Sequence, residues 1–345
     1  MRAPLSLACE DKVCVSIRWG QPGRDKIQSE MNKKIAFLFP GQGSQSVGMG
    51  QALVDQFPIA KQTFEEADEA LGFALSKLIF EGPDEDLRLT ENTQPAILTV
   101  SVAAWRVLRE QGVTPSLAAG HSLGEWSAHV AAGTLDFVDA VRAVKARGRA
   151  MQLAVPPGEG AMAAVLALDP TLVAEACREA AAETGKVVAA ANFNSPNQTV
   201  ISGALAAVEK AAELAKAKGA RRALMLPVSA PFHCSLMQPA QEEVARVLAG
   251  LILKDPTIPV AANVDGTLIS TAGEAADALT RQVTGAVRWV ECVQALVGAG
   301  AEAFVEVGPG KVLCGLLKQI DGTQKYWNVE DPASLQAALE GLAAS

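Results

Sequence analysis

Residues 117–132 read LAAGHSLGEWSAHVAA, and this stretch decides the expected fold class. Its first three residues are apolar, as in a short buried strand, and its last eight are good helix formers. Between them lies G-x-S-x-G, from Gly120 to Gly124, with Ser122 at its centre. Flanking glycines allow a turn that a Cβ would obstruct, and they leave room at the serine hydroxyl. A strand, a sharp turn and a helix form a nucleophile elbow, so the sequence predicts an α/β fold with Ser122 as candidate nucleophile.

The composition is that of a globular chain. Of the 345 residues, 49% are hydrophobic, and the formal net charge is -8. An acidic chain without a cluster of lysine and arginine offers no surface for phosphate groups, so we expect no nucleic-acid partner. The longest apolar runs, such as 35–39 and 161–168, fall far short of the roughly 20 residues that a membrane-spanning helix needs. We therefore expect no membrane partner.

Six cysteines, at positions 9, 14, 177, 234, 292 and 314, are scattered without C-x-x-C pairs or partnering histidines. Zinc sites and disulfide frameworks both show regular cysteine spacing. The sequence therefore predicts no metal site, reduced thiols and a cytoplasmic location.

The first thirty residues differ from the rest of the chain. They mix five basic with four acidic residues and contain no continuous apolar segment, so they match neither a secretory signal nor a transit peptide. The regular pattern begins at Met31, which makes Met31 an alternative start. We predict that residues 1–30 form a disordered extension.

A glycine-rich loop follows the first strand pattern. The apolar run 35–39 predicts a buried parallel strand that ends in the loop 40–45. In an open α/β sheet, backbone that contacts a ligand lies at this end of the strands. The N–H group of Gln42 is therefore a candidate donor to an oxyanion that forms at Ser122.

A change of rhythm in the middle of the chain indicates an insertion. Between residues 159 and 227 the strand and helix patterns follow the order βαββαβ, which is that of a ferredoxin-like unit. We therefore predict a small domain at 159–227, inserted into a larger α/β domain that comprises 31–158 and 228–345.

Ser122 requires a general base, because an alkoxide does not form unassisted at neutral pH. Of the three histidines, His121 belongs to the elbow, and His129 is interpreted as a hydrogen-bonded polar group of the following helix. His233, in a proline-containing loop after a strand pattern, is the candidate base. An α/β-hydrolase would add an acid, but Asp169 has the pattern of a helix cap, so no carboxylate completes a triad. A neutral carbonyl could orient the imidazole instead.

Seven short motifs occur in one order along the chain. The motifs are FPGQGSQ at 39–45, GHSLGE at 120–125, ARG at 146–148, FNSP at 193–196, PFHC at 231–234, RQ at 281–282 and VGPG at 307–310. Together they resemble the malonyl-CoA:acyl carrier protein transacylases. The similarity is collinear from about residue 35 to the C-terminus, and residues 1–30 fall outside it.

The resemblance implies a fold and a set of catalytic roles. The fold would be an α/β-hydrolase-like core with a parallel sheet and the inserted ferredoxin-like small domain. Ser122 would form a malonyl ester, and His233 would accept its proton and later activate the thiol of the carrier protein. The backbone N–H groups of Gln42 and Leu123 would form the oxyanion hole. The main-chain carbonyl of Gln282 would orient His233 in place of an acid.

The resemblance also implies two residues that select the substrate. Arg147 lies in a predicted helix with three other basic residues, for which a solvated face is the default interpretation. Its match to the family's arginine implies that Arg147 binds the free malonyl carboxylate, a task suited to the planar guanidinium. Phe232, directly before the histidine, would crowd an α-methyl branch and so favour malonyl over methylmalonyl groups.

The partners follow from the same resemblance. Malonyl-CoA would be the substrate, the phosphopantetheine would be carried by the acceptor, and no cofactor would be bound. The acyl carrier protein would dock on basic residues among Lys145, Arg221, Arg222 and Lys311, between which the sequence does not choose. A monomer is the family expectation. A free-standing chain favours fatty-acid over polyketide synthesis, and both stay open.

Two rival functions remain open at this point. A serine esterase or thioesterase would have the same elbow and would hydrolyse its substrate without a carrier protein. A scaffold that only binds the carrier protein would need neither Ser122 nor His233. Arg147, Gln42 and the lack of a third acid favour transfer.

Overall fold

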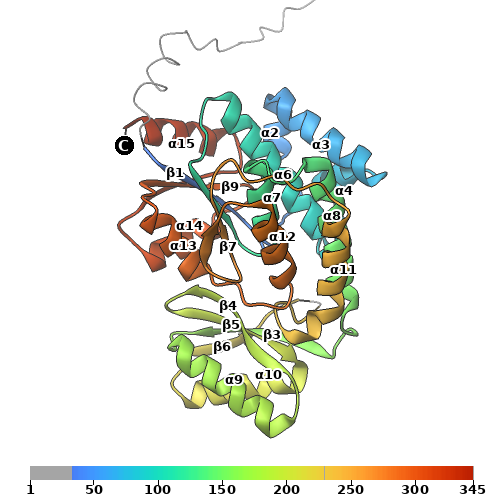
Figure 1. The fold of residues 1–345 in the computed structure, drawn as a ribbon, viewed down its shortest axis with the longest axis vertical. Helices are drawn as coiled ribbons and strands as arrows, with labels where there is room; N and C mark the ends of the chain where they lie inside the picture. The colour runs from blue at the N-terminus through green and yellow to red at the C-terminus, as the bar shows by residue number, and fades with distance from the viewer. Residues whose placement is uncertain (1–32, 229, 345) are drawn as a thin grey trace, which may run out of the picture. The chain divides into compact units, whose positions relative to one another are not determined.

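The computed structural model describes residues 33–228 and 230–344 (Figure 1). The predicted extension 1–30 and the alternative start at Met31 lie outside these residues. Contacts join residues 33 to 345 into one unit. The division at 159 and 227 into a small and a larger domain therefore stays a prediction.

The larger of two sheets has six strands in the order β10-β9-β1-β2-β7-β8. All neighbours run parallel except β8, which is antiparallel to β7. The predicted parallel core is thus confirmed, with one antiparallel strand added at its edge. The strands are β1 Ile35–Phe39, β2 Leu117–Gly120, β7 Val260–Ala262, β8 Thr267–Ile269, β9 Ala303–Val307 and β10 Lys325–Val329.

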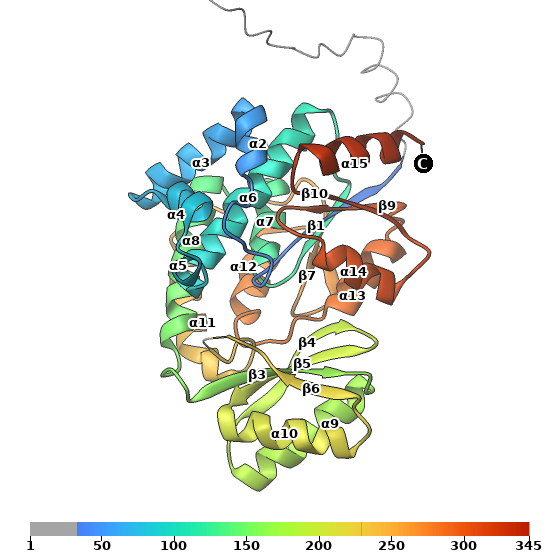
Figure 2. The same cartoon turned by 180° about the vertical axis from the view of Figure 1, so that it is seen from behind.

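Strand β1 lies in the interior of this sheet because all five of its side chains are apolar and buried. Its residues Ala36 and Leu38 pack with α13 and α14 in one core cluster. Helices α6 and α7 contact each other and the strands β9, β1 and β2 (Figures 1 and 2). The sheet is thereby covered by helices, which is why its central strands read as continuous apolar runs.

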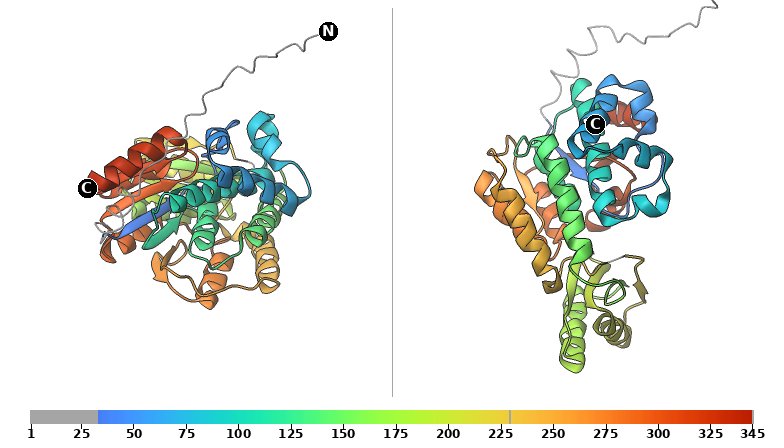
Figure 3. Two further views of the ribbon diagram at one scale, coloured as in Figure 1. Left: turned by 90° about the horizontal axis from the view of Figure 1, so that it is seen from above. Right: turned by 90° about the vertical axis from the view of Figure 1, so that its right-hand side faces the viewer.

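Thirteen further helical elements, counted among the described residues outside 159–227, connect the strands; of these, η1 is a single 3₁₀ turn and α8 lies beside α11 (Figure 3). No helix among the described residues has the length and apolar character needed to cross a membrane. The helices are α2 Gln51–Gln56, α3 Pro58–Leu71, α4 Leu75–Glu81, α5 Asp84–Leu87, α6 Thr90–Glu110, α7 Leu123–Ala131, α8 Phe137–Leu153, η1 Ser235–Met237, α11 Gln238–Ala249, α12 Ala272–Arg281, α13 Trp289–Gly298, α14 Val312–Ile320 and α15 Pro332–Ala344.

The smaller sheet has four antiparallel strands in the order β4-β5-β3-β6, and the chain order βαββαβ is the predicted ferredoxin-like one. Helices α9 and α10 pack together on one face of it, with a small-residue core of their own (Figure 2). Asp169 caps α9 through the Thr171 N–H group, as the sequence predicts. The elements are β3 Gly160–Leu166, α9 Pro170–Thr184, β4 Val188–Ser195, β5 Gln198–Ala204, α10 Leu205–Ala217 and β6 Arg222–Met225.

Strand β4 connects the two sheets. The N–H of Phe193 donates to the carbonyl of Val287 at 2.9 Å, and the N–H of Val287 donates to the carbonyl of Ala191 at 2.8 Å. The Ser195 hydroxyl adds a 2.9 Å hydrogen bond to Gln319 of α14. Both sets of contacts place β4 against the segments around α13 and α14, so the small sheet stands next to the carboxyl ends of the main strands.

Candidate active site

Ser122 stands on the predicted elbow, between the end of β2 and the start of α7. Its backbone has φ 51° and ψ -104°, a conformation that side chains with a Cβ rarely adopt. The two flanking glycines make this turn possible. A Cβ on Gly120 would lie 1.9 Å from the carbonyl carbon of Gly124, and one on Gly124 would lie 2.0 Å from the carbonyl oxygen of Phe39. The motif is therefore needed for the close approach of β1, β2 and α7.

His233 meets Ser122 across 111 residues of sequence, with 2.8 Å between Ser122 Oγ and His233 Nε2. The other ring nitrogen, Nδ1, lies 2.9 Å from the carbonyl oxygen of Gln282 and 3.2 Å from that of Gly285. Carbonyls only accept, so Nδ1 carries the proton and Nε2 is free to accept one from the serine. Burial, and then the charge of Arg147, lower the pKa of His233 to about 3, which keeps the ring neutral.

The two candidate oxyanion donors, the backbone N–H groups of Leu123 and Gln42, belong to different elements. Leu123 is the first residue of α7, and Gln42 lies in the loop after β1. Within residues 33–228 and 230–344 neither N–H has a hydrogen-bond partner. Both residues line the cavity that contains Ser122. Free donors at a helix N-terminus are suited to a developing negative charge.

Arg147 is only 1% exposed, so the default interpretation of a solvated side chain is wrong for this residue. Its guanidinium donates to Gln94 Oε1 at 2.7 Å, to Gln282 Oε1 at 2.8 Å and to Ser122 Oγ at 3.2 Å. Burial lowers the pKa of Arg147 to about 10, which still leaves it charged at neutral pH. The cation therefore lies beside the candidate nucleophile.

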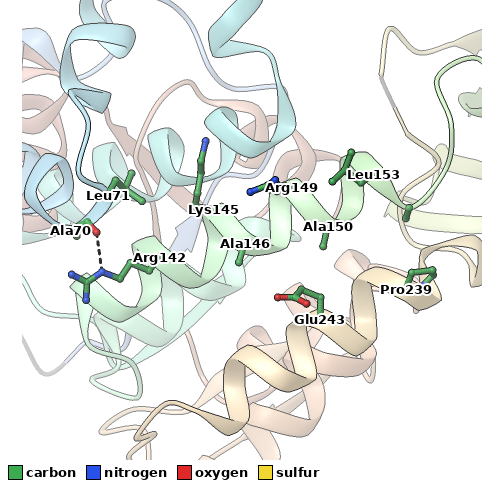
Figure 4. Close-up of a pocket in the computed structure, with 11 residues that line it drawn as sticks. Ala70, Leu71, Arg142, Lys145, Ala146, Arg149, Ala150, Leu153, Pro239 and Glu243 are labelled. Carbon is green, nitrogen blue, oxygen red and sulfur yellow. Dashed lines mark hydrogen bonds between the residues drawn. The ribbon is translucent and has the colours of Figure 1, made fainter.

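The sequence contained a signal for this inward orientation. Arg147 lies on the buried stripe of α8 with Ala140, Val144 and Met151, spaced three or four residues apart. The other basic residues of α8 point away from the site. Arg142, Lys145 and Arg149 line a separate groove between α8 and α11 (Figure 4). A lone arginine on an apolar stripe is the kind of buried charge that marks a functional position.

The predicted site residues meet in one cavity of about 170 Å³. Ser122, His233, Arg147, Gln42 and Leu123 belong to its lining, and so does Phe232, which is 7% exposed. The small sheet contributes a wall through Met162, Asn192, Asn194 and Val200. Gln282 lies just behind the cavity, where its carbonyl reaches His233.

Comparison with known proteins identifies the family. The family model for the acyl transferase domain matches residues 36–331. The chain is 50% identical over 307 residues to the malonyl CoA-acyl carrier protein transacylase of Salmonella typhimurium. The aligned residues cover 89% of this chain and 99% of that protein. The chain belongs to the malonyl CoA-acyl carrier protein transacylases. It is thus an acyltransferase, an acyl-carrier-protein S-malonyltransferase.

Solved structures of transacylases have the same fold. An acyl carrier protein S-malonyltransferase from Vibrio cholerae superimposes with a TM-score of 0.86 at 50% identity, covering 89% of this chain and 100% of that one. A malonyl-transacylase in complex with a type II polyketide acyl carrier protein gives a TM-score of 0.87 at 48% identity, covering 89% and 99%. The α/β core with its small antiparallel sheet is thereby confirmed.

Sequence reasoning missed several polar residues of this transacylase site. Asn263 and Glu125 are fully buried next to the elbow and form hydrogen bonds with its backbone or with Gln282. Burial raises the pKa of Glu125 to about 7. His121 Nε2 lies 2.8 Å from Asn194 Oδ1, which joins the elbow to the small sheet. No spacing in the sequence relates residues so far apart, although the Glu125 that follows G-x-S-x-G was visible as an acid among apolar residues.

The interpretation of His129 needs a correction. This residue of α7 is fully buried, but within the described residues neither ring nitrogen has a hydrogen-bond partner. Burial lowers its pKa to about 4, so the ring is neutral. It is an isolated neutral histidine in the core and not the hydrogen-bonded group that the sequence suggested.

Within the described residues, no three or more His, Cys, Asp or Glu side chains are grouped so that they could hold a metal ion. The cysteines at 177, 234, 292 and 314 are free and buried, and Cys9 and Cys14 lie outside the described residues.

Proposed function

We propose that this transacylase transfers the malonyl group from malonyl-CoA to the phosphopantetheine thiol of acyl carrier protein through an ester on Ser122. The family reaction supplies malonyl-acyl carrier protein for fatty-acid synthesis. One observation carries the proposed mechanism: Ser122 Oγ lies 2.8 Å from His233 Nε2 and 3.2 Å from the Arg147 guanidinium. A nucleophile, its base and a cation for the substrate carboxylate thus share one cavity.

Acylation begins with proton transfer from Ser122 Oγ to His233 Nε2. The oxygen attacks the thioester carbonyl carbon, and the N–H groups of Gln42 and Leu123 stabilise the resulting oxyanion. The C–S bond then breaks, and CoA leaves as a thiol with the proton from His233. The second half reverses these steps: His233 takes the proton of the phosphopantetheine thiol, the sulfur attacks the ester, and Ser122 regains its proton. Donor and acceptor use the same serine in turn, so the kinetics are ping-pong.

Arg147 is proposed to bind the free malonyl carboxylate. Its hydrogen-bond partners are the neutral oxygens of Gln94, Gln282 and Ser122, and no carboxylate pairs with it directly among the described residues. Glu125, the nearby acid, is bonded to Gln282 instead. A buried cation without an anionic partner favours an anionic ligand, and a guanidinium fits a carboxylate bidentately.

Phe232 is proposed to narrow the pocket on the side of the malonyl α-carbon. Its buried ring lines the cavity directly before His233. Rejection of one methyl group by an apolar pocket supplies about 1 to 3 kcal/mol of discrimination. We expect a preference for malonyl over methylmalonyl groups with some transfer of the latter; equal turnover of both CoA esters would contradict the role of Phe232.

Several further properties are part of the proposal. No cofactor is bound: malonyl-CoA enters as substrate, and the phosphopantetheine arrives on the carrier protein. The chain acts as a cytoplasmic monomer, and light scattering of the purified protein tests the monomer. The catalytic domain comprises 31–158 and 228–345, and 159–227 forms the small domain. Among the candidate docking residues, Lys145 is engaged with Glu91 and Asn92, which favours Arg221, Arg222 or Lys311.

Mass spectrometry of the acylated protein tests the mechanism. After brief exposure to malonyl-CoA, we expect a malonyl adduct on the peptide that contains Ser122 in the wild type, none in Ser122→Ala, and very slow formation in His233→Ala. Addition of holo acyl carrier protein should discharge the adduct as malonyl-carrier protein. An adduct at another residue contradicts the nucleophile, and free malonate as the main product would favour the thioesterase alternative.

A further inference from the structure

Behind the elbow lies a buried bracket of three side chains, Glu125, Asn263 and Gln282. Each is 0% exposed. They come from three separate segments: Glu125 from the first turn of α7, Asn263 from the residue after β7, and Gln282 from the end of α12. None of the three faces solvent, and their side-chain polar atoms have hydrogen-bond partners within the protein, except Glu125 Oε1, which has none among the described residues.

Asn263 holds both sides of the elbow. Its Oδ1 accepts from the Ser122 N–H at 2.7 Å, and its Nδ2 donates to the Gly120 carbonyl at 2.8 Å. Ser122 has the unfavourable φ of 51°, and such a conformation persists only where its surroundings hold it. An amide supplies an acceptor and a donor on one rigid plane, which neither aspartate nor leucine can do.

Gln282 touches the base, the cation and the nucleophile. Its main-chain carbonyl accepts from His233 Nδ1 at 2.9 Å. Its side-chain Oε1 accepts from the Arg147 guanidinium at 2.8 Å, and its Nε2 donates to the Ser122 carbonyl at 2.9 Å. The backbone and the side chain of this residue therefore have separable tasks.

Glu125 fixes the orientation of this arrangement. Its Oε2 accepts from the Asn263 N–H at 2.9 Å and from Gln282 Nε2 at 2.7 Å. A carboxylate oxygen accepts, so it holds the NH₂ end of the Gln282 amide toward itself and leaves Oε1 facing Arg147. The direction of the Gln282–Arg147 hydrogen bond is thus set from behind the site.

We propose that Asn263 and the Gln282 side chain are positioning residues with different tasks. Asn263 maintains the strained elbow, on which every acyl donor depends. The Gln282 amide, oriented by Glu125, positions the Arg147 guanidinium. Only a donor with a free carboxylate depends on that guanidinium. This inference rests on the proposed roles of Ser122 and Arg147 and adds that substrate selection is controlled by a residue outside the cavity lining.

The two tasks predict different substrate patterns. Gln282→Met keeps the main-chain carbonyl and the approximate volume but removes the amide. We expect it to lower kcat/KM for malonyl-CoA about 10- to 100-fold more than for acetyl-CoA, as for a lost hydrogen bond to a charged group, while the lost hydrogen bond from the amide to the Ser122 carbonyl lowers both values by a smaller common factor. Asn263→Ala should lower kcat for both donors by the same factor, about 100-fold or more, because the elbow serves both.

The proposed roles of Asn263 and Gln282 are tested by single-turnover acylation of Ser122 in the full chain with both CoA esters. The melting temperature of each variant is measured as well. Thr99→Val, a buried polar substitution in α6 away from the bracket, controls for general loss of stability. Asn263→Ser replaces Asn263→Ala where the alanine variant does not fold. Equal losses of kcat/KM for both donors in Gln282→Met would contradict the proposal that the Gln282 amide positions Arg147. Unchanged acylation in a folded Asn263 variant would contradict the proposal that Asn263 maintains the elbow. Absence of the Ser122 adduct in the wild type would instead contradict the proposed function.

Discussion

At the level of single residues, neither Arg147 nor His233 forms a hydrogen bond with a carboxylate among the described residues. Arg147 is buried with neutral hydrogen-bond partners, and His233 is oriented by carbonyl oxygens instead of an acid. Burial lowers the pKa of His233, and the nearby Arg147 guanidinium lowers it further. In the proposed mechanism, the cation that binds the substrate carboxylate therefore also helps to keep the base neutral.

Arg147→Ala should lower kcat/KM for malonyl-CoA by about 100-fold or more, since loss of one partner of a buried charge pair costs about 2 to 5 kcal/mol. Acetyl-CoA has no carboxylate, so its transfer should change little. Arg149→Ala is the matched control, because this exposed arginine lies on the opposite side of the same helix. Steady-state kinetics with both donors check the prediction, and a parallel loss for the two donors would refute the carboxylate role.

The pH profile of acylation tests the state of His233. Its pKa of about 3 means that the ring stays neutral, and able to accept the serine proton, well below the ordinary histidine range. With acetyl-CoA, kcat/KM should therefore stay flat from pH 8 to about pH 5. In Arg147→Ala the acid limb should move to higher pH, because the positive charge that lowers the pKa is gone. A decrease of the wild-type kcat/KM centred near pH 6.5 would contradict this prediction, because it would show that His233 titrates at the ordinary histidine pKa.

At the level of elements, close backbone approach creates the elbow. Strands β1 and β2 and helix α7 meet at Gly120 and Gly124, where no side chain fits. The same approach brings the loop after β1, with Gln42, beside Leu123 at the start of α7. Helix α8 then supplies Arg147 from its buried stripe while its outer residues face the groove beside α11 (Figure 4).

Gly124→Ala should disrupt this junction. Its Cβ would lie 2.0 Å from the Phe39 carbonyl oxygen, so β1 and α7 would have to separate, at about 3 kcal/mol or more. We expect a lower melting temperature and almost complete loss of Ser122 acylation. Gly315→Ala is the control: it lies exposed in α14 with no atom within 4 Å of the added Cβ, and it should stabilise the protein by about 1 kcal/mol. A Gly124→Ala protein with wild-type stability and activity would contradict the account of the elbow.

At the level of the whole molecule, burial of ionisable groups makes stability depend on pH. Burial lowers the pKa of His121, His129 and His233 below the ordinary value of 6.5. As the pH falls below 6.5, these rings therefore bind protons more readily in the unfolded chain than in the folded one. Burial raises the pKa of Glu125 and Glu306, which act in the opposite direction. Between pH 6.5 and 4.5, His129 and His233, with pKa values of about 4 and about 3, take up protons on unfolding, and Glu125, with a pKa of about 7, releases one. Together these three groups make the free energy of unfolding decrease as the pH falls.

His129→Leu should remove much of this dependence. Its pKa of about 4 in the folded chain lies below the ordinary 6.5, so it costs stability as the pH falls through that window, by at most about 1.4 kcal/mol per pH unit. Denaturant unfolding at pH 7 and pH 5 should show a smaller difference for His129→Leu than for the wild type. Ser127→Ala, another buried and unpartnered group of α7 that does not titrate, should keep the wild-type difference. An unchanged pH dependence in His129→Leu would refute the contribution of this ring.

Much of the fold was readable from local pattern. The predicted strand 35–39 matches β1, and the order βαββαβ was predicted correctly. Packing can override local signals. Helix α6, Thr90–Glu110, includes Pro95 in its interior, a position that local propensity disfavours for proline. Strand β10 and helix α15 were not anticipated, since β10 is half exposed and lacks a continuous apolar run.

The sequence by itself determined the elbow, the α/β class and the pairing of Ser122 with one of only three histidines, because glycine spacing and strand or helix periodicity are local properties. Only the tertiary structure decided that Arg147 turns inward, that the His129 ring nitrogens find no hydrogen-bond partner among the described residues, and that Asn263 reaches the Ser122 N–H across 141 residues. The reason is geometric. Such contacts depend on which faces of separate strands and helices meet, and that is settled by packing of the whole core.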